Sequence, residues 1–442
     1  MLNRFTADYL DALGQADFRP MQRIAGRLAS FDGLLMEAIG LNLPVGTVCQ
    51  VGERHGGVEA EVIGFRNGRT LLMNLGGPAP LLPDAPVRPI GPPGEAEVGA
   101  ALLGRVVDGA GRPIDGLGPI RGARHWPLAG RLQSPLDRGR VLEPLDVGVR
   151  AINGLLTIGK GQRIGIMAGS GVGKSVLLGM MVRAATADVI VIGLIGERSR
   201  EVADFLETKV AGAARGRSVV VAVPANHSPV LRIRGALRAT AIAEAFRAEG
   251  RNVLLIMDSL TRVAHAGREI GLALGEPASA RGYPPSAIAM LPNLIERAGT
   301  DVASGGAITA IYTVLADGDD GNDPVVDSAR SILDGHIVLS RALAERAVYP
   351  AIDVSKSVSR VMTDIAAPAH LRAARILRRH LATYEENRDL VLMGAYRSGS
   401  DPEIDAAIAC HPAVIEYVRQ DADAVVPLAD AVAELTGVFG DG

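Results

Sequence analysis

The chain has 442 residues, a net charge of −3 at pH 7 and only 3% aromatic residues. At about 150 residues per domain, this length suggests about three domains. A nearly neutral chain with few aromatic residues lacks the positive field and the stacking surface of a dedicated nucleic-acid binder, which argues against a helicase. The only cysteines, Cys49 and Cys410, lie in opposite terminal regions, and this favours a reducing compartment without a disulfide framework.

The N-terminal segment is not a signal sequence by its composition. MLNRFTADYL has no apolar core, and no run of about 18 apolar residues occurs anywhere in the chain, so we expect a cytoplasmic protein. Apolar residues at helical spacing form a stripe within residues 1–20, namely Leu2, Phe5, Tyr9, Leu10 and Leu13. We interpret residues 1–22 as a partner-binding segment, with a frayed terminus or a helix packed on its own barrel as the alternatives.

Residues 23–92 consist of short apolar runs that are broken by glycine and proline. Asn67 and Gly68 stand between two strand-like runs and predict a β-hairpin. Several short strands at this spacing predict a small β-barrel, with a structural or ring-forming role. The following stretch, residues 91–144, is rich in Gly, Pro and Arg and is predicted to be connecting loops.

From residue 145 to residue 360 apolar runs alternate with helical stretches. The runs are RIGIMA, DVIVIGLIG, SVVVAVP, NVLLIMD, AITAIYTVL and HIVLS. Such runs are typical of parallel strands that helices cover on both faces, so residues 93–364 are predicted to form an α/β nucleotide-binding domain. Residues 365–442 show no strand pattern and are predicted to be a helical domain. In it, Arg372, Arg375, Arg378 and Arg379 are interpreted as a solvated or subunit-facing helix face.

The segment QRIGIMAGSGVGKS, residues 162–175, breaks from a strand into a glycine-rich loop and continues into a helix. Glycines let the backbone wrap around a polyphosphate, and the helix N-terminus adds a partial positive charge. Lys174 supplies a charge for the β- and γ-phosphates, and the Ser175 hydroxyl is placed to ligate Mg²⁺. Ala168 departs from the glycine that usually opens this pattern. The predicted nucleotide-binding residues of the loop are Ala168, Gly169, Ser170, Gly171, Val172, Gly173, Lys174 and Ser175.

Two carboxylates follow apolar strands and complete a candidate catalytic site. Asp258 ends NVLLIM, where an acidic residue holds Mg²⁺, directly or through water, next to Ser175. Glu197 follows VIGLIG, and a carboxylate at the carboxyl edge of a sheet can orient and polarise the attacking water. Arg198 is a candidate contact to the γ-phosphate, with an ion pair to a neighbour such as Glu201 as the alternative.

Several long motifs resemble known families. GERSREV, DSLTRVAHAGREIGLALGEPASARGYPPS, ADGDDGNDP and YPAIDVSKSVSRVM resemble the catalytic subunits of rotary ATP synthases. RAINGLLTIGKGQRIGIMAGSGVGKSVLLGMM and NRDLVLMGAYRSGSDP resemble the flagellum-specific ATPase of the type III protein-export apparatus. The resemblance covers nearly the whole chain. It implies an N-terminal β-barrel, a central RecA-like P-loop domain with a parallel sheet, a C-terminal helical domain, and a homohexameric ring with nucleotide at the subunit interfaces.

The same resemblance implies a role for individual residues, with ATP and Mg²⁺ as the ligands. Lys174 and Ser175 contact phosphate and Mg²⁺, Glu197 activates water, Arg198 contacts the γ-phosphate, and Asp258 is the Walker B acid. Tyr349 of YPAID matches the residue whose ring packs on adenine; the alternative is an ordinary core tyrosine. Arg360 of SVSR matches the arginine finger.

The function implied by the resemblance is Mg²⁺-dependent ATP hydrolysis that energises the export of flagellar proteins. The implied partners are copies of the chain itself, regulatory or stator and stalk proteins, export chaperones and substrates, but no nucleic acid, at a cytoplasmic location peripheral to the inner membrane. The main alternative is the ATPase of a virulence-type secretion system. A proton-coupled synthase subunit is disfavoured because residues 365–442 lack a DELSEED-type acidic segment. A non-catalytic ring subunit is disfavoured by Glu197.

Overall fold

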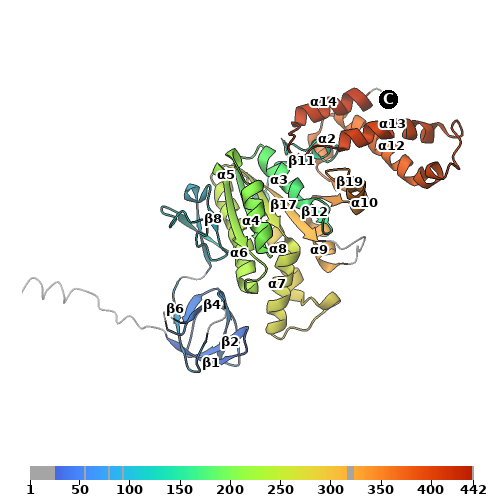
Figure 1. Cartoon of the computed structure of the whole chain (residues 1–442). Coiled ribbons are helices and arrows are strands. Elements are labelled where there is room, and N and C mark those ends of the chain that lie inside the picture. Colours follow the sequence, from blue (N-terminus) through green and yellow to red (C-terminus); the bar gives the residue numbers. More distant parts are fainter. Residues whose placement is uncertain (1–24, 54–55, 78–79, 92–93, 316–322, 441–442) are drawn as a thin grey trace, which may run out of the picture. The chain divides into compact units, whose positions relative to one another are not determined.

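The computed structural model describes residues 25–53, 56–77, 80–91, 94–315 and 323–440. The chain forms two compact units, Met1–Pro93 and Gly94–Gly442, which are described separately (Figure 1). The predicted partner-binding segment, residues 1–22, lies outside the described residues, so it stays a prediction. In the part of the chain that the structure covers, no helix combines the length and the apolarity needed to cross a membrane.

The first unit is a closed β-barrel, as predicted. Its strands within the described residues follow the order β1-β2-β5-β4-β3-β6. Their bounds are β1 Gly26–Phe31, β2 Leu35–Ile39, β3 Val48–Val51, β4 Val58–Arg66, β5 Arg69–Asn74 and β6 Pro86–Pro89. The predicted hairpin joins β4 and β5, and Asn67 and Gly68 have φ angles of 49° and 72°, which a tight two-residue hairpin turn requires. Side chains that point inward, such as Met36 and Leu72, are completely buried.

The second unit is built on a sheet with the order β19-β18-β12-β17-β15-β13-β14-β8. From β18 to β8 the neighbouring strands are parallel, and β19 is antiparallel to β18. The bounds are β8 Val106–Val107, β12 Arg163–Ala168, β13 Val189–Ile195, β14 Ser218–Val223, β15 Asn252–Asp258, β17 Ala307–Leu315, β18 Gly335–Leu339 and β19 Ile352–Ser359, with the short β16 Gly299–Thr300 beside β17. Every residue of β13 and β14 is buried, as the continuous apolar runs predict.

Helices cover both faces of this sheet, so the predicted α/β architecture is confirmed. The helices of this region are α2 Arg150–Leu155, α3 Lys174–Ala184, α4 Ser199–Thr208, α5 Ala213–Gly216, α6 Pro229–Arg247, α7 Leu260–Ala273, α8 Pro285–Ile295, α9 Pro324–Ile332 and α10 Arg341–Glu345. The longest of them, α6, packs against β13, β14 and β15 and is buried over most of its circumference.

The stretch predicted to be connecting loops contributes more structure than expected. β7 (Glu95–Val98) pairs with β9 (Arg124–Pro127), and β8 adds a short edge strand to the main sheet. The buried Arg238 of α6 holds the turn after β8, because its guanidinium donates hydrogen bonds to the carbonyls of Gly109 and Ala110. Strands as short as β8 have no periodicity that a sequence pattern can reveal.

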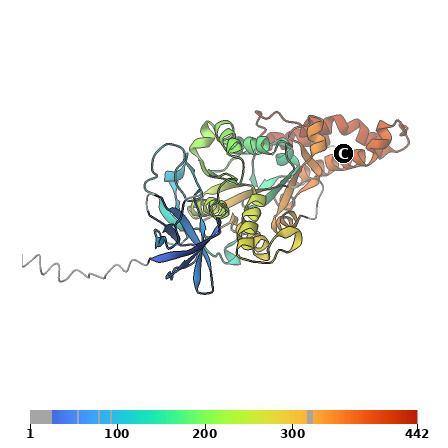
Figure 2. The same cartoon turned by 60° about the horizontal axis from the view of Figure 1, so that its bottom comes forward.

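The C-terminal part is helical, as predicted. It contains α11 Met362–Ile365, α12 Pro368–Leu392, α13 Pro402–Val418 and α14 Leu428–Phe439. In Figure 1, α12, α13 and α14 lie together beyond β19, and Figure 2 shows the same orange-to-red helices gathered on one side of the sheet. Their buried side chains, among them Leu377, Tyr417 and Leu435, belong to the same apolar core as β12 and α2. The helical part is therefore packed directly on the sheet.

Candidate active site

The glycine-rich loop lies between the end of β12 at Ala168 and the start of α3 at Lys174. Gly171 and Gly173 have φ angles of 77° and 91°, in the left-handed region where glycine is favoured. Ala168 is the last residue of the strand and is buried. Its extended backbone suits alanine, so the departure from glycine at the first motif position causes no strain.

Lys174 lies between the two predicted carboxylates. Its Nζ atom is 2.5 Å from Asp258 Oδ1 and 3.5 Å from Glu197 Oε1, and all three side chains are at most 13% exposed. Strand order explains this arrangement: β15 ends at Asp258, and the neighbouring β13 pairs Leu194 with Asp258, so that Glu197 follows at the same edge. The structure thus brings Lys174 to carboxylates that are 84 and 23 positions away in the sequence.

Burial and charge act in opposite directions on these groups. Burial by itself would lower the pKa of Lys174, but the charges of Asp258 and Glu197 outweigh it and hold that pKa above its ordinary value. Burial raises the pKa of Glu197, the charge of Asp258 adds to this, and Lys174 opposes it. Glu197 Oε1 is buried and accepts no other hydrogen bond from the described residues. It is therefore open to a further hydrogen-bond donor, such as a water molecule.

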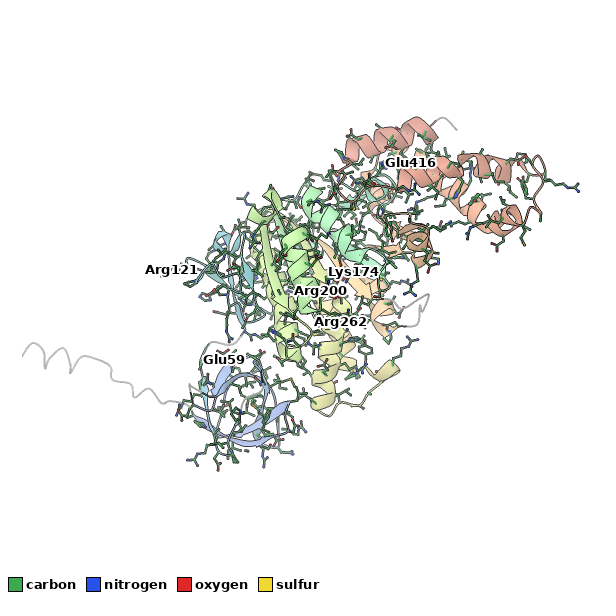
Figure 3. The ribbon with its side chains drawn as sticks, viewed as in Figure 1. Glu59, Arg121, Lys174, Arg200, Arg262 and Glu416 are labelled. Atoms are coloured by element: carbon green, nitrogen blue, oxygen red, sulfur yellow. The ribbon has the colours of Figure 1, made fainter. Side chains whose placement is uncertain are left out.

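Two further residues interact with the carboxylates of Asp258 and Glu197, and the sequence analysis did not identify them. Thr313, in β17 between β12 and β15, donates a hydrogen bond of 2.6 Å to Asp258 Oδ1. Arg262, near the start of α7, packs against Gly196, and its charge lowers the pKa of Glu197; Figure 3 labels Arg262 and Lys174. The position of Arg262 at the end of the motif DSLTR, which begins with Asp258, could have revealed it. No sequence signal distinguishes Thr313 from Thr309, the other buried threonine of the same largely apolar strand.

Arg198 and Tyr349 have more exposed positions. The Arg198 side chain is 84% exposed and lies 3.5 Å from Glu201, so the ion pair considered as an alternative is present. Tyr349 is 44% exposed, which an ordinary core tyrosine is not. Its ring is next to the glycine-rich loop, since Cδ1 and Cε1 lie 3.6 Å from the place a Cβ atom on Gly173 would occupy.

Arg360 lies at the amino edge of the sheet, where the parallel strands begin, opposite the carboxyl edge, where they end. It directly follows β19, which runs antiparallel to β18, and its backbone N–H donates to the carbonyl of Asp334. The N–H of Asp334 in turn donates to the carbonyl of Arg163, the first residue of β12. The loop begins after Ala168, five residues later, or about 16 Å along the strand at about 3.3 Å per residue. The structure therefore does not bring Arg360 to the glycine-rich loop of its own chain.

Together, the parallel sheet, the loop between β12 and α3 and the carboxylates beside Lys174 define a P-loop nucleoside triphosphatase. The model of the ATP synthase alpha/beta family nucleotide-binding domain matches residues 148–359, and that of the T3SS EscN ATPase C-terminal domain matches residues 366–437.

Full-length relatives agree with these matches. The chain is 50% identical to the flagellum-specific ATP synthase of Pseudomonas aeruginosa, over 98% of this chain and 97% of the relative. It is 45% identical to the type 3 secretion system ATPase of Pseudomonas savastanoi pv. phaseolicola, over 93% and 92%. The solved structure of the assembled ATPase EscN in complex with its central stalk EscO, from enteropathogenic E. coli, is similar with a TM-score of 0.86 at 40% identity, over 94% of this chain and all of that one.

The chain belongs to the type III export ATPases, a branch of the ATP synthase alpha/beta family. It is an ATPase with ATP as its nucleotide. The predicted family, fold and enzyme class are confirmed.

Proposed function

We propose that the chain forms a homohexameric ring that couples Mg²⁺-dependent ATP hydrolysis to the export of flagellar proteins. The observation that carries the ATPase site is the placement of Lys174 between the buried carboxylates of Asp258 and Glu197. The flagellar assignment is supported by the 50% identity to the flagellum-specific relative, against 45% to the type 3 secretion system ATPase. A virulence-type export role is the second candidate.

In the proposed site, Lys174 contacts the β- and γ-phosphates and exchanges its ion pair with Asp258 for phosphate oxygens. Glu197 holds the attacking water through Oε1, which accepts no hydrogen bond from the described residues other than at the 3.5 Å approach of Lys174, and accepts the proton, for which its raised pKa is suited. Arg198 leaves its exposed ion pair with Glu201 for the γ-phosphate. Tyr349, exposed beside Gly173, packs on the adenine.

The residues present fit a Mg²⁺ ion that takes most of its ligands from phosphate and water. Ser175 is exposed at the start of α3, and the carboxylate of Asp258 lies beside Lys174. Among the described residues, no group of three or more His, Cys, Asp or Glu side chains could hold a metal, and Mg²⁺ bound to a nucleotide needs none. When bound, Mg²⁺ neutralises charge on the phosphate oxygens.

Arg360 serves the site of the neighbouring subunit in this proposal. The reason is the strand direction, which puts Arg360 at one edge of the sheet and the P-loop at the other. The assembled state of EscN supports a ring, and its complex with EscO supports a stalk partner for this chain. Regulatory proteins, export chaperones, export substrates and a peripheral place at the inner membrane are further parts of the proposal.

The test uses the purified protein and a strain that lacks its gene. Lys174→Ala should abolish Mg²⁺-dependent ATP hydrolysis, because the phosphates lose both charge and positioning, whereas Lys160→Ala removes only a partly exposed ion pair with Glu143 and should retain it. The gene deletion should abolish swimming, and the native gene, but not the Lys174→Ala gene, should restore it. Full motility of the deletion strain, with loss of effector secretion instead, would favour the virulence-type role.

A further inference from the structure

A bulge in β19 lies close to Arg360, with the paired residues Val358 and Ser359 between them. In its pairing with β18, Val358 lies opposite His336 and Asp353 lies opposite Val338. Residues 354–357 of β19 therefore face a single residue of β18. Ser357 stabilises the bulge, because its hydroxyl donates to the carbonyl of Asp353 and accepts from the N–H of Val338. The conformation of this bulge sets the backbone from which Arg360 projects.

Arg378 of α12 holds the bulge from the helical part of the chain. Its Nη1 atom donates to the carbonyls of Val354, at 3.0 Å, and Ser357, at 3.2 Å. Its Nη2 atom donates to the carbonyl of Leu155 at the end of α2, at 2.8 Å. Burial lowers the pKa of this guanidinium, and the three carbonyls compensate the cost of burying it. The planar guanidinium of Arg378 thus links α12 to the bulge in β19 and to the end of α2.

This finding differs from the sequence-based interpretation of the arginine cluster. Arg372, Arg375 and Arg379 are more exposed on α12, as expected, but Arg378 points inward. Glu385 lies on the same face of α12, two turns after Arg378. Its Oε2 atom accepts a hydrogen bond of 2.8 Å from the hydroxyl of Ser355 in the bulge. Helix α12 therefore contacts the bulge at two points.

The end of β19, next to Arg360, is also hydrogen-bonded to residues of the main sheet and its loops. Gln162 Nε2 donates to Ser359 Oγ and to the carbonyl of Asp334, the same carbonyl that accepts the N–H of Arg360. The Arg360 side chain is exposed and makes only a long hydrogen bond of 3.4 Å to the carbonyl of Arg330 among the described residues. Its position therefore depends on its backbone more than on its own side-chain contacts.

We propose that Arg378 is a positioning residue for Arg360, through which α12 sets the placement of the finger that enters the neighbouring subunit's site. This inference rests on the proposed role of Arg360 in trans. The P-loop of the same chain lies at the other edge of the sheet and is unaffected.

The first measurement is the steady-state kinetics of Arg378→Gln, with Arg379→Ala as the matched control on the same helix. A misplaced finger should lower kcat at least about 10-fold, while the affinity for a fluorescent ATP analogue stays within about twofold because the P-loop is intact. Arg378→Lys should recover part of the loss, since an ammonium group can bond to one or two of the three carbonyls. Arg379→Ala should behave like the native protein.

Rings that contain two kinds of chain then show whether Arg378→Gln damages the finger or the P-loop of its own chain. Arg378→Gln chains mixed with Lys174→Ala chains should regain activity, because the intact fingers of the latter complete the intact P-loops of the former. Mixed with Arg360→Ala chains they should not, since neither chain supplies a correctly placed finger. Co-purification with a tag on one of the chains verifies that mixed rings form.

Each outcome bears on a separate claim. If Arg360→Ala and Lys174→Ala chains fail to complement each other, the trans role of Arg360 fails, and this inference fails with it. If that pair does complement, but Arg378→Gln chains also restore Arg360→Ala chains, the finger of Arg378→Gln is intact and only this inference is overturned. If Arg378→Gln does not assemble, Arg378→Lys is tested in the same two mixtures with the same criteria.

Discussion

The two edges of the central sheet differ in how they hold the residues of the proposed site. At the carboxyl edge, Lys174, Glu197 and Asp258 form a buried, mutually charged cluster that the protein's own contacts hold together. At the amino edge, Arg360 has an exposed side chain, and the contacts that fix it go to its backbone. The difference shows that the P-loop and Arg360 of one chain lie too far apart to meet, so in the proposed function the nucleotide-binding residues and the finger come from different chains. Assembly of identical chains is then the way to complete a site.

After Lys174→Ala, the largest effect is expected at the amino edge. Arg360→Ala should lower kcat by about 10³-fold or more, because a guanidinium that stabilises charge on the transferred phosphoryl group contributes that much in related chemistry. Binding of an ATP analogue should change little, and specific activity of the native protein should rise with concentration as rings form. Normal turnover by Arg360→Ala chains would break the comparison, because the carboxyl edge would then suffice by itself.

Glu197→Gln tests the carboxyl edge. The variant should bind ATP but hydrolyse it about 10²- to 10⁴-fold more slowly, since the amide cannot accept the proton of the attacking water. In the native protein, burial raises the pKa of Glu197, and only the carboxylate form is active. As the pH falls, kcat/KM should therefore decline at a higher pH than the ordinary glutamate value of about 4.3. Near-normal turnover by the variant would remove Glu197 from this role.

Tyr349→Ala should have a smaller effect, confined to binding at the carboxyl edge. Stacking of a base on an aromatic ring contributes about 1–3 kcal/mol, so KM for ATP should rise roughly 10-fold with little change in kcat. Tyr349→Phe keeps the ring and should behave like the native protein. A drop in kcat at unchanged KM would indicate that the ring positions the loop at Gly173 and does not bind adenine.

The smallest effect is expected from Asp334→Asn, at the amino edge. Asp334 accepts hydrogen bonds from the backbone N–H and the guanidinium of Arg163, and Arg163 also pairs with Glu296. The remaining ion pair limits the loss to about 1–2 kcal/mol of unfolding free energy, measurable as a lower melting temperature. Because the carbonyl that holds Arg360 is unchanged, kcat should fall at most a fewfold. A loss as large as that of Arg360→Ala would make Asp334 part of the finger machinery.

Short-range patterns in the sequence by themselves determined much of this protein. The strand, loop and helix around Lys174, the buried parallel strands, the barrel hairpin at Asn67 and Gly68 and the C-terminal helices all follow from residue types within windows of about ten residues. Backbone freedom, hydrophobic periodicity and turn chemistry act over that range. The motifs around Glu197, Asp258 and Arg360 also named the candidate residues, although not their arrangement.

The tertiary structure decided which of these residues meet. The ion pair of Lys174 with Asp258, the contribution of Thr313 and the position of Arg262 depend on the strand order, which no local pattern contains. The inward direction of Arg378 depends on β19 being packed against α12, since on the sequence it is one of several similar arginines. The separation of Arg360 from its own P-loop follows from one antiparallel strand at the end of a parallel sheet. Strand direction is set by long-range packing, and here it places Arg360 and the P-loop at opposite edges of the sheet.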